Sequence, residues 1–385
     1  MTTLEATPVL DGRYRDLKLV NVDPGTGVAR GVFSLVFRAY DMLDMRYVAL
    51  KFYDIDPAKI TDVYRLDSFK REHALLQSLV SAPRCLQLLS PFAEYKLAVS
   101  LPGGHSFEIP CNYFAVEWVD DQIDEFFELQ DTKDPVDKLH LFNEIILATE
   151  ALHRRGISHR DLKPDNLRMT YKGGSRVVVA IDLGTAARIS STRIASAYTR
   201  SVGAPAYSAP EALCGLAGLR PLERYTDYYA LGCMLFQLFN RDYFLRELRN
   251  RNAHYSAILT AMSISVSPHL SDDQKLREWH GALLRHGRGV TAVSIDIPGN
   301  SVPPAILQKL DAVVQELTHF DYRKRPRSLE AVRQGIWGAI KCLTNEKTSR
   351  KRIEDAKLRR LARIARVAAR ERRRVERIGR ERINA

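Results

Sequence analysis

HRDLKPDN, residues 159–166, places an arginine, two aspartates, a lysine and an asparagine in one short stretch. A plain surface turn does not need this density of charge. Apolar residues recur at roughly helical spacing before it, from Lys138 to His153. Two strand-like runs follow it, Leu167–Thr170 and Arg176–Ile181, with two glycines between them. The sequence therefore predicts a helix, a charged loop and a β-hairpin in succession.

The predicted hairpin brings two oxygen-bearing side chains together. Asn166 enters its first strand and Asp182 leaves its second, so we expect them to lie side by side near Asp161. Oxygen ligands of this kind suit Mg2+, which keeps several waters and shares phosphate oxygens. A charged turn remains the simpler interpretation for any one of these residues, but the whole set favours a site.

Three motifs occur in a fixed order along the chain: HRDLKPDN, then Asp182-Leu183-Gly184, then Ala209-Pro210-Glu211. They resemble the motifs of the eukaryotic-type protein kinase family, and the resemblance extends from about Arg13 to Leu343. It implies an α+β fold of two lobes, a small antiparallel β lobe and a larger mainly helical lobe, with ATP between them.

The resemblance also implies roles for the residues of the loop. Asp161 would accept the proton of the substrate hydroxyl, and Lys163 would steady the transferred phosphoryl group. Asn166 and Asp182 would hold Mg2+. Lys163 resembles the residue of the serine/threonine-specific branch, so the expected substrates are proteins phosphorylated on Ser or Thr.

A lysine and a glutamate are expected to pair in the small lobe. Val48-Ala49-Leu50-Lys51 resembles the strand whose lysine contacts the α and β phosphates. Glu72 lies on the apolar face of a helix predicted over Asp67–Leu79. A carboxylate facing the core needs a cation, because an unpaired buried charge costs several kcal/mol. Lys51 is the natural candidate.

The resemblance places the adenine and phosphates against the small lobe, where strands are predicted over Leu17–Val22, Val32–Ala39 and Tyr47–Tyr53. Gly31–Val36 resembles the second half of the phosphate-covering loop, with Ala29 and Ser34 replacing two glycines, so nucleotide affinity is expected to differ. A strand over Tyr113–Val119 resembles the hinge, with Val116 as gatekeeper, and Tyr95–Pro110 is predicted to be a long turn. The expected ATP-binding residues are Gly31, Ser34, Val36, Ala49, Lys51, Glu117 and Val119.

The segment between Asp182 and Glu211 is rich in Ser, Thr and Arg, as is typical of a mobile surface loop, and resembles the activation segment. Ala204 replaces the family's threonine, which hydrogen-bonds the catalytic Asp and Lys. Arg160 is expected to receive a phosphate that the protein adds to its own Thr199, or in second place to Ser201. The alternative is that Arg160 pairs with a nearby carboxylate.

The resemblance assigns structural roles to three further residues. Asp227 opens a predicted buried helix that ends near Phe239 and would brace the backbone of the catalytic loop. Arg325 matches the arginine that pairs with Glu211.

Composition limits the class of protein. The chain has 385 residues, 45% of them apolar, which is ample for buried cores. Its five cysteines form no CxxC pair, so neither a zinc site nor a disulfide framework is expected. The N-terminus does not resemble a secretory signal, and no apolar run reaches the length of a membrane span. We therefore expect a cytoplasmic protein that does not span a membrane.

The basic charge belongs to the C-terminal tail. Residues 346–385 hold 16 Lys+Arg and 6 Asp+Glu, so +10 of the formal +12 lies there and +2 remains for residues 1–345. Composition predicts a helix. Three interpretations stay open: a solvated helix, a helix for self-association or a partner, and a strip that binds nucleic acid or another polyanion. The apolar stripe consists of Leu361, Ile364, Ala368, Val375 and Ile378, interrupted by Glu371.

The predicted organisation is an N-terminal extension (1–12), a small lobe (13–119), a large lobe (120–345) with an insertion at about 240–300, and the tail (346–385). The predicted function is ATP- and Mg2+-dependent phosphorylation of Ser/Thr on proteins. The alternatives are a pseudokinase scaffold and a polyanion-binding module acting through the tail. A pseudokinase is expected to lack one of four residues, all of which are present: Lys51, Asp161, Asn166 and Asp182.

Overall fold

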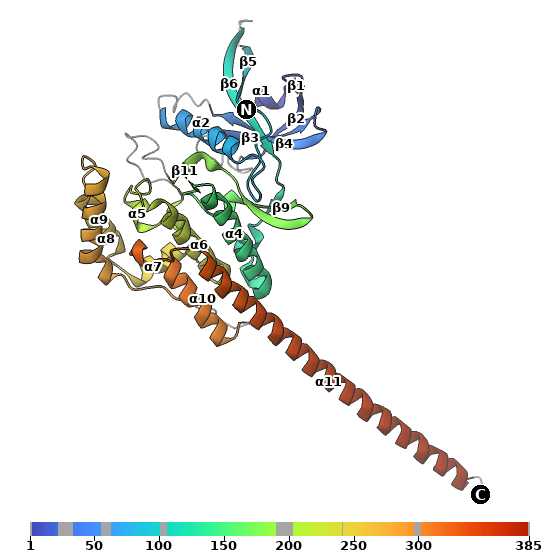
Figure 1. Ribbon diagram of the computed structural model, residues 1–385. Coiled ribbons are helices and arrows are strands. Elements are labelled where there is room, and N and C mark those ends of the chain that lie inside the picture. Colours follow the sequence, from blue (N-terminus) through green and yellow to red (C-terminus); the bar gives the residue numbers. More distant parts are fainter. Residues whose placement is uncertain are drawn as a thin grey trace.

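A computed structural model describes residues 2–21, 34–54, 63–100, 106–189, 203–240, 242–295 and 302–383. Its N-terminal region is rich in β-strands and its C-terminal region is helical, as Figure 1 shows. The two-lobed α+β expectation is therefore confirmed.

The N-terminal region is built on a six-stranded sheet in the order β1-β2-β3-β4-β6-β5, antiparallel throughout. Its core contains Phe37, Phe52 and Tyr113, and the last two rings stack with centroids 5.0 Å apart. Helix α2 (Val63–Ser78) belongs to the same region. Phe69 and Leu76 on this helix, and Leu79 just after it, are buried as the sequence predicted. The strands are β1 (Val9–Leu10), β2 (Tyr14–Leu19), β3 (Ser34–Asp41), β4 (Arg46–Tyr53), β5 (Ala93–Ser100) and β6 (Ser106–Glu117), preceded by the short helix α1 (Thr2–Glu5).

The prediction of a long turn over Tyr95–Pro110 is wrong. β5 pairs with β6 along their full described length, from Ala93 opposite Tyr113 to Ser100 opposite Ser106. Apolar residues alternate along this hairpin, and Tyr95, Leu97 and Ile109 pack against the small-lobe core. Cross-strand pairing thus extends through residues 95–100 and 106–110, which were expected in the turn, whereas Gly103 and Gly104 lie outside the described residues.

The C-terminal region surrounds two buried helices, α4 (Pro135–Arg154) and α6 (Glu223–Phe239). Asp134 caps α4 by accepting a hydrogen bond from the Val136 amide, and Pro135 occupies the first turn, where a missing N–H costs nothing. Helix α10 (Pro304–Leu317) packs against α6 and against the start of α11. Short helices α3 (Glu125–Glu128) and α5 (Pro210–Leu213) complete this core.

Residues 240–300, expected to be an insertion, contain three helices that share the large-lobe core. These are α7 (Phe244–Arg251), α8 (Tyr255–Ser265) and α9 (Asp272–His286). Their Phe244, Tyr255 and Trp279 are buried in the same apolar cluster as α6. A full capping box at Ser271 and Gln274 begins α9.

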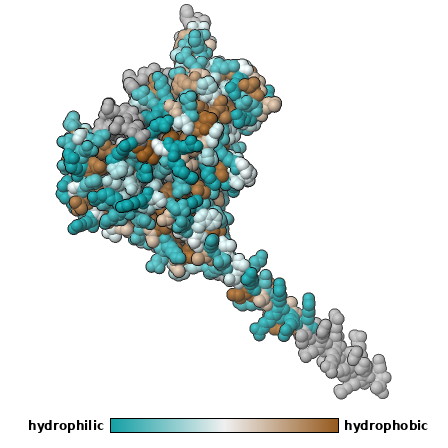
Figure 2. Space-filling view, in the orientation of Figure 1, coloured by the Kyte–Doolittle hydropathy of each residue, from teal (hydrophilic) through white to brown (hydrophobic). Residues whose placement is uncertain are grey.

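Helix α11 (Glu330–Ile383) confirms the helical tail but begins inside the large lobe. Its first turns bury Val332, Ile336 and Leu343, and the helix then projects away from the body (Figures 1 and 2). Every side chain from Lys351 to Arg366 is exposed. None of the helices in the described ranges combines the length and the hydrophobicity that a membrane span requires.

Candidate functional site

A buried carboxylate holds the loop of residues 159–166 in place. This loop links β8 (Ile157–Ser158) to β9 (Leu167–Lys172). Asp227 of α6 accepts hydrogen bonds from the amides of His159 (2.9 Å) and Arg160 (2.7 Å) and from the Ser158 hydroxyl (3.0 Å). Burial disfavours its charge, yet the hydrogen bond with His153 and the loop amides outweigh burial and lower the pKa of Asp227. Helix α6 therefore fixes the backbone of this loop through Asp227.

Asp161 is held by hydrogen bonds to both carboxylate oxygens. Its Oδ1 accepts from the Ala204 amide at 2.7 Å and its Oδ2 from the Asn166 carboxamide at 3.0 Å. Lys163 Nζ lies 3.8 Å from Oδ2. Burial raises the pKa of Asp161, against the lowering influence of Lys163 and the Ala204 amide.

Lys51, Glu72 and Asp182 form a chain of charges across three elements. Lys51 Nζ lies 2.6 Å from Glu72 Oε1 and 3.3 Å from Asp182 Oδ1. The Leu183 amide also donates to Glu72 Oε1, at 3.0 Å. Burial works against the charge of Lys51, but the two carboxylates outweigh it and raise its pKa. Burial likewise opposes the charge of Asp182, whereas Lys51 lowers its pKa.

The predicted hairpin is present and brings Asn166 and Asp182 to the same end. β9 pairs with β10 (Ser175–Ala180), with Leu167 opposite Ala180, and the Ile181 amide donates to Asn166 O at 2.9 Å. Asp182 adopts a left-handed φ of 58°, which is rare for a residue other than glycine and typical of functional sites.

The side chains at this end of the β9–β10 hairpin suit an Mg2+ ion that would also bind phosphate oxygens. Asp182 and Asn166 offer hard oxygen atoms, and the Asp182 side chain is 43% exposed. Among the described residues, no three His, Cys, Asp or Glu side chains gather to hold a metal by themselves. Phosphate oxygens and water would have to supply the other ligands of an Mg2+ ion held by these two residues.

The expected nucleotide-binding residues lie along β3, β4 and the end of β6. Val36 lies opposite Lys51 on the neighbouring strand, and Ser34 and Ala49 are buried. Glu117 ends β6 and Val119 is buried just after it. Gly31 lies outside the described residues.

Asn21 has a role that the sequence did not reveal. Its side chain donates to Ser34 O at 2.8 Å and accepts from the Val36 amide at 2.7 Å. It therefore joins the residues just after β2 to the start of β3, on either side of residues 22–33, which the structure does not describe. No periodicity or motif marks a single asparagine of this kind.

Arg160, within the loop of residues 159–166, is buried without a hydrogen-bond partner for its Nε or Nη1 in the described part of the chain. Burial lowers its pKa. No ion pair joins it to a described carboxylate, and Thr199 and Ser201 lie outside the described residues.

Arg71, directly before Glu72, binds the carbonyls of Gly184 (2.8 Å) and Ala186 (3.1 Å), a contact that the sequence analysis missed.

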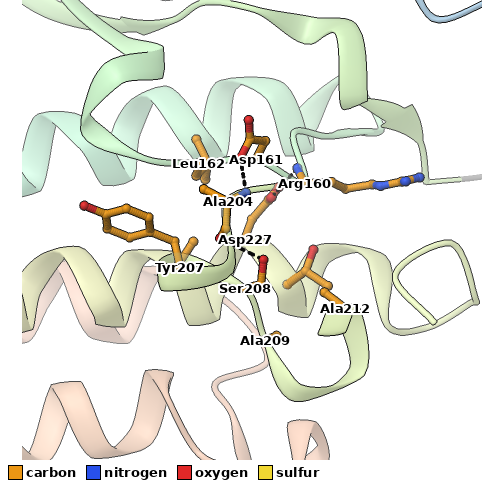
Figure 3. Close-up of a pocket in the computed structure, with 11 residues that line it drawn as sticks. Arg160, Asp161, Leu162, Ala204, Tyr207, Ser208, Ala209, Ala212 and Asp227 are labelled. Atoms are coloured by element: carbon orange, nitrogen blue, oxygen red, sulfur yellow. Dashed lines mark hydrogen bonds between the residues drawn. The ribbon is translucent and has the colours of Figure 1, made fainter. Parts of the chain in front are cut away.

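The end of the segment is anchored by a bidentate ion pair. Arg325 Nη1 and Nη2 lie 2.5 and 3.0 Å from the two oxygens of Glu211, with both side chains fully buried. Figure 3 shows the backbone amide of Ala204 pointing toward the Asp161 carboxylate. The Ser208 hydroxyl donates to Ala204 O at 2.9 Å. Ala204 thus reaches Asp161 through its main chain.

Known proteins match this chain over most of its length. The protein kinase domain model matches residues 25–337. Serine/threonine-protein kinase PrkC of Bacillus subtilis (strain 168) is 31% identical over 232 residues, which cover 60% of this chain and 30% of the relative. CBL-interacting protein kinase 28 of Oryza sativa subsp. japonica is 30% identical over 217 residues, which cover 56% of this chain and 44% of the relative. The matches thus span less than half of each of these relatives, but the family match covers most of this chain, which belongs to the protein kinase family.

Proposed function

We propose that the protein is an ATP- and Mg2+-dependent kinase that phosphorylates Ser and Thr on protein substrates. The observation that carries the proposal is the convergence of Lys51, Glu72 and Asp182 with Asp161 and Asn166 at one edge between the lobes. Lys51 contacts both Glu72 and Asp182, Asn166 contacts Asp161, and the Ile181 amide, next to Asp182, donates to the Asn166 carbonyl. Phosphoryl transfer depends on such positioning and on neutralisation of charge.

Each residue has a distinct task in this mechanism. Lys51, held by Glu72, binds and orients the α and β phosphates. Asp161 orients the substrate hydroxyl and accepts its proton, and Lys163 stabilises the charge on the transferred group. Asp182 and Asn166 would hold Mg2+, which supplies neutralisation of phosphate charge when bound.

The relatives support the amino-acid specificity, since PrkC of Bacillus subtilis and the probable PknB of Corynebacterium glutamicum are named serine/threonine-protein kinases.

All five cysteines are free, in keeping with a cytoplasmic location. The residues whose loss would favour a pseudokinase are all present.

The test is transfer from γ-labelled ATP to a generic basic protein, followed by phosphoamino-acid analysis. We expect phosphoserine and phosphothreonine in the presence of Mg2+ and no transfer after chelation with EDTA. Phosphotyrosine as the main product would contradict the specificity, and transfer that persists in EDTA would contradict the role of the metal.

We further propose that the kinase activates itself by phosphorylation at Thr199, with Ser201 second. The buried Arg160 guanidinium supports this, because a phosphate would supply the partner that the described residues do not. Mass spectrometry after incubation with ATP should find the phosphate in the parent and not in Asp161→Asn. Full activity of an unmodified parent, or parental activity in both Thr199→Ala and Ser201→Ala, would contradict the switch.

A further inference from the structure

A polar cluster joins three segments, and its central residue, Lys172, has no part in any of the roles described above. Lys172 ends β9 of the large lobe, and Glu117 ends β6 of the small lobe. Lys172 Nζ lies 2.7 Å from Glu117 Oε1 and 2.7 Å from Cys85 O, in the loop that follows α2. The two side chains of this ion pair are only 23% and 22% exposed.

The loop side of the cluster is organised by Gln87. Its amide donates to Glu117 Oε1 at 3.0 Å, and its carbonyl accepts from the Glu117 amide at 2.9 Å. Its side chain donates to Cys85 O at 2.7 Å and accepts from the Ser81 amide at 2.7 Å. Glu117 is therefore bound through both its main chain and its carboxylate.

The same loop is also attached to the large lobe. Cys85 forms a β-bridge with Ala180 of β10, and Arg84 pairs with Glu144 of α4. Lys172 adds the contact that reaches both this loop and the end of β6. The place where the chain passes from the small lobe to the large one is thus held against the β9–β10 hairpin.

We propose that Lys172 is a positioning residue for nucleotide binding, which fixes Glu117 and the end of β6 where adenine is expected. This proposal rests on the proposed function. A charged hydrogen bond has a defined geometry, and removal of the lysine leaves a half-buried carboxylate without its cation. Water then solvates the carboxylate better than the protein does, so the side chain turns outward and the end of β6 moves with it.

The consequence is selective because the reacting groups lie on other segments. Lys51, Asp161 and Asp182 have their own partners, and none of them contacts Lys172. Loss of Lys172 should weaken ATP binding while the rate of transfer from bound ATP is kept. A role in general stability would not separate these two quantities.

The experiment compares Lys172→Met with the parent in the full chain. We expect the KM for ATP and the Kd for a fluorescent ATP analogue to rise about tenfold, with kcat within about twofold. Lys172→Arg should recover most of the affinity. The matched control is Lys96→Met, whose pair with Glu108 is 3.9 Å long and about two-thirds exposed, and which should leave both constants unchanged.

Parental KM and Kd in Lys172→Met would overturn the proposal, as would a loss confined to kcat. If Lys172→Met does not fold, Glu117→Gln keeps the side-chain shape, removes the charge and should raise KM in the same direction; an unchanged KM there overturns the proposal. A parent that binds no ATP would instead overturn the proposed function, and this proposal with it.

Discussion

Asp161 receives one of its hydrogen bonds from the main chain of Ala204, at a position where the family carries a threonine. This arrangement depends on the residue before it. Gly203 has a φ of +93°, and a Cβ at that position would lie 2.7 Å from Arg160 O and 3.2 Å from Asp161 Oδ1. The chain can pass so close to the catalytic loop only without a side chain.

Gly203→Ala should therefore impair both stability and catalysis. We expect a loss of about 1–3 kcal/mol in the free energy of unfolding, the usual cost of a strained backbone conformation, and a lower kcat. Urea unfolding and initial rates measure the two effects. Gly218→Ala is the control, because its Cβ would meet no atom within 4 Å. Equal behaviour of the two variants would contradict the close approach.

Glu223, a buried carboxylate near Arg160, gives the stability of the protein a pH dependence. Burial raises the pKa of Glu223 from its usual 4.5 to about 7, although Arg220 and Arg160 oppose the rise. The folded protein then holds a proton that the unfolded chain has released, so stability falls as pH rises from about 4.5 to about 7.

Glu223→Gln should remove this part of the pH dependence. At pH 8 the variant is expected to be more stable than the parent by up to about 3 kcal/mol, and the difference should shrink toward zero near pH 4. Thermal unfolding across this range measures it. Parallel stability curves for the two proteins would show that Glu223 titrates normally.

At the scale of elements, the sequence predicted those with strong local patterns. The helix before residues 159–166 and the β9–β10 hairpin lie at nearly the expected residues, because their periodicity and turn residues act locally. The tail is helical as predicted, but its helix begins earlier than expected, at Glu330. The β5–β6 hairpin was missed because it depends on cross-strand pairing and on packing against a distant core.

The polar contacts that position the site were predictable only where a motif marked them. Lys51 with Glu72 and Arg325 with Glu211 each join residues far apart in sequence, and the order of the family motifs pointed to them. Asn21 and Lys172 carry no such mark, since a single polar residue at the end of a strand usually faces water. Their partners become visible only once the chain is folded.

The tail is the element whose partner stays a prediction. If residues 346–385 bind nucleic acid through phosphates, affinity for duplex DNA should fall by about 0.9 log unit per neutralised phosphate for each log unit of salt. Deletion of these residues should abolish that binding and leave phosphoryl transfer unchanged, because the side chains from Lys351 to Arg366 are exposed. Binding that survives deletion, or a flat salt dependence, would favour a partner helix or a solvated one.

At the scale of the whole molecule, the fold serves to bring distant segments to one edge. Lys51 comes from the β sheet, Glu72 from α2, and Asp161 and Asp182 from the two sides of the β9–β10 hairpin. Lys51 pairs with Asp182, and the Leu183 amide donates to Glu72, so the two lobes must pack together before the small-lobe pair faces the large-lobe groups. Phosphoryl transfer at this edge is therefore the activity that the arrangement predicts.

The most direct measurement is the rate of phosphoryl transfer from γ-labelled ATP in Asp161→Asn and Asp165→Asn, each compared with the parent. The two aspartates lie in the same loop, but the Asp165 side chain is 74% exposed whereas Asp161 is held by Ala204 and Asn166. We expect Asp161→Asn to fold normally and to lose about 10²–10⁴-fold in rate, as for removal of a positioned acid–base group, and Asp165→Asn to match the parent. Parental activity in Asp161→Asn would contradict the assignment of this site.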